Sequence, residues 1–147
     1  MEHLQEERYK DYLSIRVYPE SKLIHTCWLR TVSSGEFRAG LLHLQAVILQ
    51  QQLELWLLDA NHLAPPDVLD QKWTIEKLLR SLEEAKLRKI ALILPDDPIF
   101  HMLGESMKAR VYSLFSQKIL LDCFSRTDHA RYWLLLSSET EDASPGI

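Results

Sequence analysis

Two almost wholly apolar stretches decide the fold: Leu53-Glu54-Leu55-Trp56-Leu57-Leu58-Asp59 and Lys89-Ile90-Ala91-Leu92-Ile93-Leu94. Runs of this kind are typical of strands that are buried on both faces of a sheet. Between them, residues 70–85 carry large apolar side chains at the spacing of a helix. A strand, a helix and a second strand in this order form a unit with a right-handed crossover and two parallel strands. The centre of the chain therefore predicts an α/β fold.

The pattern continues toward the N-terminus. Residues 12–18 alternate polar and apolar side chains, Pro19-Glu20-Ser21 has the composition of a turn, and residues 23–29 form a second strand. A connection this short makes the two strands antiparallel. Ser33-Ser34-Gly35-Glu36 then matches a capping box, which predicts that a helix begins there. The N-terminal part is therefore an antiparallel hairpin followed by a helix.

The C-terminal part repeats the alternation of helices and strands. Residues 60–66 form a loop, and Asp97-Pro98 supplies an N-cap and a first helical residue for a helix that ends near Phe115. Residues 118–124 form the last strand, and residues 125–128 cap a final helix. The whole order predicts a mixed, mostly parallel central sheet with an N-terminal antiparallel hairpin and helices packed on it.

Length and composition are those of one globular domain. The chain has 147 residues, of which 46% are hydrophobic and 26% are charged. We expect one domain over residues 1–147 with a core of about residues 12–136, and frayed termini over residues 1–8 and 138–147, which are polar or acidic.

Charge and composition exclude several classes of protein. The 17 basic and 21 acidic residues give a net charge of −4, which argues against a nucleic-acid binder. The charged N-terminus has no apolar core of a signal peptide, and no apolar run approaches the roughly 20 residues of a membrane span. Four glycines and two cysteines argue against a glycine-rich nucleotide loop and a disulfide framework. We expect a cytoplasmic protein.

Several stretches resemble one known family. They are the strand end 57–59, the helix start 70–73, the entry Arg88-Lys89 into the strand 90–93, and Phe124 with residues 129–134. Over about residues 12–136, the chain resembles bacterial SpoIIAA-like proteins. These are STAS-like domains, related to anti-sigma factor antagonists and to the CRAL-TRIO lipid-binding group. The resemblance implies a non-enzymatic binding or regulatory module.

One departure from that family concerns its phosphorylation switch. Anti-sigma factor antagonists carry a phosphorylatable serine at the start of the helix after a central strand. The equivalent stretch here contains Asp59-Ala60-Asn61-His62 and Pro65-Pro66-Asp67, and from Gly35 to Arg80 the only hydroxyl belongs to Thr74. We therefore expect that the serine switch is missing.

Polar residues follow the predicted strands, at the edge where open α/β sheets bind ligands. The candidate rim for a ligand or partner consists of Asp59, Asn61, His62, Trp73, Asp96 and Asp97. Trp73 either lines a pocket with His62 and Leu63 or attaches the Pro-rich loop to the domain, and the second interpretation is favoured. The carboxylates allow a metal-dependent hydrolase that uses Asp59 with Asp96 or Asp97, although Asp97 already serves as a helix cap.

No catalytic or metal-binding motif is present, and no cofactor is predicted. We therefore expect a protein that is not an enzyme, with a regulatory or protein-interaction function and an unidentified protein partner. The alternatives are a carrier or sensor of a small apolar ligand or lipid, and the hydrolase. A homodimer is expected as well, because residues 12–18 form a sheet edge with one charge and no proline.

Overall fold

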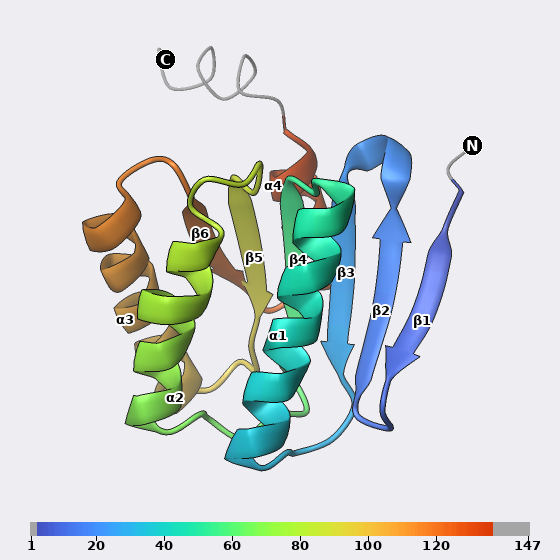
Figure 1. Cartoon of the computed structure of the whole chain (residues 1–147). Helices are drawn as coiled ribbons and strands as arrows, with labels where there is room; N and C mark the ends of the chain where they lie inside the picture. Colours follow the sequence, from blue (N-terminus) through green and yellow to red (C-terminus); the bar gives the residue numbers. More distant parts are fainter. Residues whose placement is uncertain (1–2, 137–147) are drawn as a thin grey trace.

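A six-stranded sheet runs through the protein, and its strands lie in the order in which they occur along the chain (Figure 1). The computed structural model describes residues 3–136. Strands β1 (Gln5–Tyr9), β2 (Leu13–Tyr18) and β3 (Leu23–Trp28) are antiparallel neighbours. Strands β4 (Leu55–Asp59), β5 (Lys89–Ile93) and β6 (Leu120–Phe124) continue the sheet parallel to β3. The predicted mixed α/β sheet with an N-terminal antiparallel part is confirmed.

The helices cover the two faces of this sheet unequally. Figure 1 shows α1 (Ser34–Gln51), α2 (Val68–Trp73) and α3 (Pro98–Phe115) in front of the sheet and α4 (Thr127–Leu135) behind it. A π-helical segment, Thr74–Leu79, continues α2, and a single 3-10 turn, Pro19–Ser21, joins β2 to β3. No helix within residues 3–136 is long and apolar enough to cross a membrane.

The alternation of side chains along each strand supplies two separate cores. Trp56 of β4 belongs to the larger core under α1, α2 and α3, whereas Leu57 belongs to a smaller core under α4. Both residues are buried, which is why β4 has a continuous apolar sequence. Lys89 is 2% exposed, and its Nζ donates to the carbonyls of Trp133 (3.0 Å) and Leu136 (3.1 Å). This cation satisfies the C-terminal carbonyls of α4 and attaches that helix to the sheet.

Capping residues predict the starts of α1 and α3 correctly, whereas α4 begins at Thr127 behind Arg126, whose side chain makes no cap hydrogen bond. Ser33 Oγ accepts from the backbone N–H of Glu36, and the Glu36 carboxylate accepts from the N–H of Ser33, so that the capping box is complete. The Asp97 carboxylate caps α3 by accepting from the backbone N–H groups of Ile99 and Phe100. The helix expected over residues 70–85 instead begins at Val68 behind the N-cap Asp67, and its π-helical part ends at Leu79.

The N-terminal prediction is wrong for residues 5–8, which belong to β1 instead of a frayed end. These residues are exposed, so they lack the apolar alternation that marks a half-buried strand. Their pairing rests on the backbone ladder to β2 and on ion pairs such as Glu6 with Arg16 at 3.5 Å. Because β1 covers β2, residues 12–18 do not form the exposed sheet edge on which the homodimer prediction rests. The expected frayed segment 138–147 lies outside the described residues.

Candidate functional site

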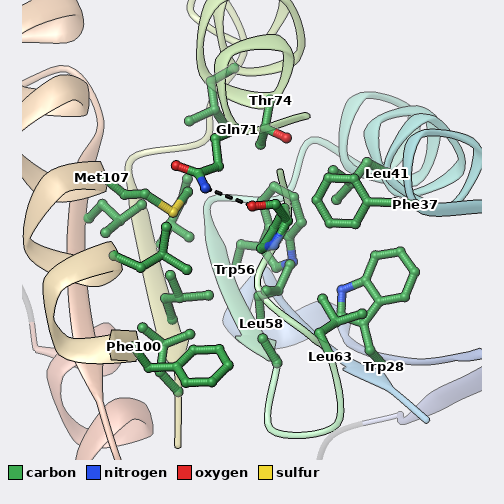
Figure 2. A pocket seen from close by; sticks show the side chains of 18 of the residues that line it. Trp28, Phe37, Leu41, Trp56, Leu58, Leu63, Gln71, Thr74, Phe100 and Met107 are labelled. Carbon is green, nitrogen blue, oxygen red and sulfur yellow. Dashed lines mark hydrogen bonds between the residues drawn. The ribbon is translucent and has the colours of Figure 1, made fainter. Parts of the chain in front are cut away.

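An apolar cavity lies between the sheet and the helices α1, α2 and α3 (Figure 2). Its volume is about 80 Å³. Large side chains from every surrounding element line it, among them Trp28, Trp56, Leu92, Phe37, Phe100 and Met107. No charged residue lies among the lining residues. The cavity is therefore suited to an uncharged, mainly apolar molecule.

Regular side-chain spacing in the sequence builds the walls. Phe37 and Leu41 lie four residues apart on α1, and Phe100, Leu103 and Met107 follow one face of α3. The floor comes from alternate residues of the sheet, such as Leu58 of β4 and Leu92 of β5. The same spacing would produce an ordinary core if the helices packed closely. Here Gln71 of α2 and Phe100, Leu103 and Met107 of α3 all line the cavity, so the cavity lies between these two helices.

The loop over residues 60–67 closes one side of the cavity. Ala60, Leu63, Ala64 and Pro66 line the cavity. Two side-chain hydrogen bonds fasten the loop to α2: Gln71 Nε2 donates to the Pro66 carbonyl at 2.7 Å (Figure 2), and the Asp67 carboxylate accepts from the Asp70 backbone N–H at 2.8 Å. At its other end the backbone N–H of Ala60 donates to the Ile93 carbonyl at 2.9 Å. The loop is therefore held to the sheet at its start and to α2 by Gln71 and Asp67 near its end.

A polar network beside this loop joins α1 to α2. Asp70 is 4% exposed, and its Oδ1 accepts from Arg38 Nε at 2.7 Å and from Ser34 Oγ at 2.8 Å. Its backbone N–H donates to Asp67 Oδ1 at 2.8 Å. The Arg38 guanidinium also lies 5.1 Å from the centre of the Trp73 ring. A buried carboxylate with a cation and two donors is well compensated, so this network holds the two helices together.

The six candidate rim residues do not assemble into one site. Asn61 and His62 are exposed in the loop, and Trp73 packs against the main core beside Arg38 without lining the cavity. Asp96 pairs with His101 at 3.0 Å, and Asp97 caps α3. Asp59 ends β4 and accepts from the Asn61 backbone N–H at 3.0 Å.

Asp59 lines a different hollow on the α4 side of the sheet, together with Arg16, His25 and Cys27. Asp96 lines a third hollow, beside α3, so the carboxylates that the hydrolase needs are not brought together. Within residues 3–136 no group of three or more His, Cys, Asp or Glu side chains is placed to hold a metal ion.

Two titratable groups beside Asp59, His25 and Cys27, have pKa values shifted toward their neutral forms. Burial lowers the pKa of His25, and the nearby Arg131 lowers it further. Burial also raises the pKa of the Cys27 thiol, as does the Asp59 carboxylate. A nucleophilic cysteine needs the opposite shift, toward the thiolate. The arrangement therefore disfavours nucleophilic catalysis by Cys27.

Sequence reasoning placed the candidate site on polar residues and missed the cavity. Apolar side chains at Trp28, Leu92 or Met107 have the same spacing whether they fill a core or surround a cavity, and only the packing distance between helices separates the two cases. The one sequence signal near the site is the Pro-rich loop, which was correctly expected to follow β4.

Comparison with known proteins supports the fold. No family model matches the chain, and no curated protein matches it. Among solved structures, an uncharacterised protein of the DUF3478 family from Shewanella loihica PV-4, described as having a SpoIIAA-like fold, superposes with a TM-score of 0.54. The match covers 90% of this chain and 92% of that chain at 12% identity. The chain therefore has a SpoIIAA-like fold, as the sequence resemblance implied.

Proposed function

We propose that this chain is a non-enzymatic STAS-like module that binds a small apolar ligand in the cavity between the sheet and α1, α2 and α3. The observation that carries the proposal is a cavity of about 80 Å³ whose lining residues include no charged side chain. By the same measure one water molecule needs roughly 10–15 Å³, so the cavity is larger than a packing defect. An apolar cavity of about 150 Å³ stays dry and binds benzene. This cavity is about half as large, so a six-membered ring fits only if the lining side chains move apart, and each CH₂ group that is buried contributes about 0.8 kcal/mol.

Three features support a function without catalysis. The carboxylates of the hydrolase alternative, Asp59 and Asp96, lie in separate hollows, and burial raises the pKa of the Cys27 thiol. The segment from β4 to α2 has no serine, and the start of α2 already carries the carboxylate of Asp67, which accepts from Asp70 N–H. The proposed module therefore responds to a ligand and not to a kinase.

Both cysteines are free thiols, which fits a reducing compartment such as the cytoplasm.

Native mass spectrometry of the full chain, with thermal unfolding against a panel of small hydrocarbons, tests this function. The Leu103→Phe variant fills the cavity from α3, and Leu114→Phe makes the same change at a residue of α3 that is 37% exposed and does not line the cavity. We expect bound hydrocarbon and a raised Tm with the wild type and Leu114→Phe, and neither with Leu103→Phe. Equal behaviour of the two variants would refute the proposal.

A protein-docking function is the second candidate. At the starts of α2 and α3, Val68, Leu69, Ile99 and Met102 are 65–74% exposed, which is unusual for large apolar side chains that lie near one edge of a sheet. A pull-down from the source cell with the Leu69→Ser, Met102→Ser variant should lose a partner that the Leu49→Ser control retains. Identical recoveries would exclude this surface as the docking site.

A further inference from the structure

The indole N–H of Trp28 is a buried hydrogen-bond donor without an acceptor among residues 3–136. Trp28 is 0% exposed and lines the cavity. The second buried tryptophan of the cavity differs, because Trp56 Nε1 donates to Thr26 Oγ1 at 3.0 Å. Buried donors are almost always paired, and an unpaired one is unfavourable enough to need an explanation.

The surroundings of Trp28 prevent the ring from turning to find a partner. Its ring stacks on Tyr12 and on Phe37, with centroid distances of 5.9 Å and 5.6 Å. The far end of its six-membered ring touches α1 so closely that a Cβ added at Gly40 would lie 2.7 Å from it. In Figure 2 the indole nitrogen lies on the edge of Trp28 that is turned toward the other lining residues. The N–H is therefore fixed in orientation, at the wall of the cavity.

The side-chain donors of two other polar residues of the wall already have acceptors. Gln71 Nε2 donates to the Pro66 carbonyl, and Thr74 Oγ1 donates to the Asp70 carbonyl at 2.8 Å. Leu63, from the loop over residues 60–67, lies on the same side of the cavity as Trp28 in Figure 2. The loop that carries Leu63 is joined to α2 by two side-chain hydrogen bonds, from Gln71 Nε2 to the Pro66 carbonyl and from the Asp70 backbone N–H to Asp67 Oδ1.

We infer that the ligand is a small, uncharged and mainly apolar molecule with one hydrogen-bond acceptor oxygen, such as a ketone, ester or ether, and that Trp28 Nε1 donates to this oxygen. The inference rests on the proposed function, since it names the ligand class of the same cavity. A charged acceptor is excluded by the absence of any charged lining residue, because an unpaired buried charge is strongly unfavourable.

The test uses two probes of nearly identical shape, cyclohexanone and methylenecyclohexane. Cyclohexanone has a C=O group that can accept a hydrogen bond, and methylenecyclohexane has a C=CH₂ group in its place that cannot. The full chain labelled with ¹⁵N has four indole N–H signals, one for each tryptophan. We expect both probes to bind and to shift the NMR signals of residues that line the cavity. Cyclohexanone alone should move the signal of the Trp28 indole proton strongly downfield, because this proton then forms a new hydrogen bond.

Two variants measure the same contact by affinity. In Trp28→Phe the ratio of the Kd for cyclohexanone to the Kd for methylenecyclohexane should rise about tenfold, which corresponds to about 1.4 kcal/mol. In the matched Trp56→Phe control the donor that is lost was already paired with Thr26, so the ratio should stay constant. If Trp28→Phe does not fold, the indole signal of the wild type decides the question.

The outcomes separate the two proposals. If methylenecyclohexane binds but the Trp28 signal is the same with both probes, or the ratio does not change in Trp28→Phe, the acceptor inference is wrong and the proposed function stands. If neither probe binds, the proposed function is wrong and the inference fails with it.

Discussion

Gly40 is the position at which a single methyl group tests the packing behind the cavity. It lies in the middle of α1, where a glycine is less favourable than an alanine by about 1 kcal/mol. A Cβ at this position would lie 2.7 Å from Cη2 and 3.2 Å from Cζ3 of Trp28, and 3.3 Å from Cδ2 of Leu13. These contacts are shorter than van der Waals distance, so Gly40→Ala must move the indole or α1.

The magnitude follows from two opposing contributions. An added methyl group in a tightly packed core destabilises by about 1–3 kcal/mol, and the upper part of this range applies because the Trp28 ring also stacks on Tyr12 and on Phe37. The gain in helix propensity offsets about 1 kcal/mol of this. We therefore expect Gly40→Ala to lower the free energy of unfolding by about 2 kcal/mol and the Tm by roughly 4–8 °C.

Urea unfolding followed by circular dichroism measures this change. The matched control is Gly35→Ala in the first turn of the same helix, where the nearest atom to the added Cβ is Ser33 Oγ at 4.0 Å. The control should unfold like the wild type or be slightly more stable. A Gly40→Ala variant as stable as Gly35→Ala would mean that Trp28 is free to shift, and it would remove the basis for a fixed indole N–H.

Three further predictions follow from contacts outside the cavity. Lys89→Met should destabilise the protein by about 1–3 kcal/mol in urea, because the carbonyls of Trp133 and Leu136 lose a buried donor; an unchanged stability would show that α4 is held by its apolar face alone. Arg30 lowers the pKa of Asp11 and of Glu36, so the stability from these pairs is present at neutral pH and is lost as the pH falls below their ordinary values of 3.8 and 4.5. The Tm of Arg30→Gln should therefore decline less steeply between pH 5 and pH 3 than that of the wild type, and parallel curves would contradict these two ion pairs. Replacement of both Glu6 and Glu7 by proline should break β1 and uncover β2, so that the mass in sedimentation equilibrium rises with protein concentration; a variant that sediments like the wild type would show that β1 does not protect this edge.

The sequence predicted the helices and strands that have one apolar and one polar face, and the strands that are apolar on both faces. Strands β4 and β5 are buried on both sides, and the capping residues Ser33 and Asp97 fix where α1 and α3 begin. Strand β1 escaped prediction because it is exposed on both sides and depends on backbone pairing with β2. The π-helical continuation of α2 likewise has no pattern that distinguishes it from an α-helix.

The candidate site could not be predicted from the sequence, because it depends on which residues are neighbours in space. Polar residues such as Asp59 and Asp96 mark strand ends in the sequence, but their neighbours in space depend on which face of the sheet each side chain takes. A cavity is a property of distances between helices, which no spacing of apolar residues records. The orphaned donor on Trp28 is visible only once its neighbours are known, since Trp56 in the next strand has a partner.

The most direct test of the central claim is a methyl NMR titration of the full chain with methylenecyclohexane. The claim predicts saturable shifts for the methyl groups of Leu58, Leu92, Leu103 and Met107, which line the cavity, and none for Leu49 and Leu114, which do not. Absence of saturation, or shifts of equal size at the exposed leucines, would show that the cavity is only a feature of the core and would contradict the proposed function.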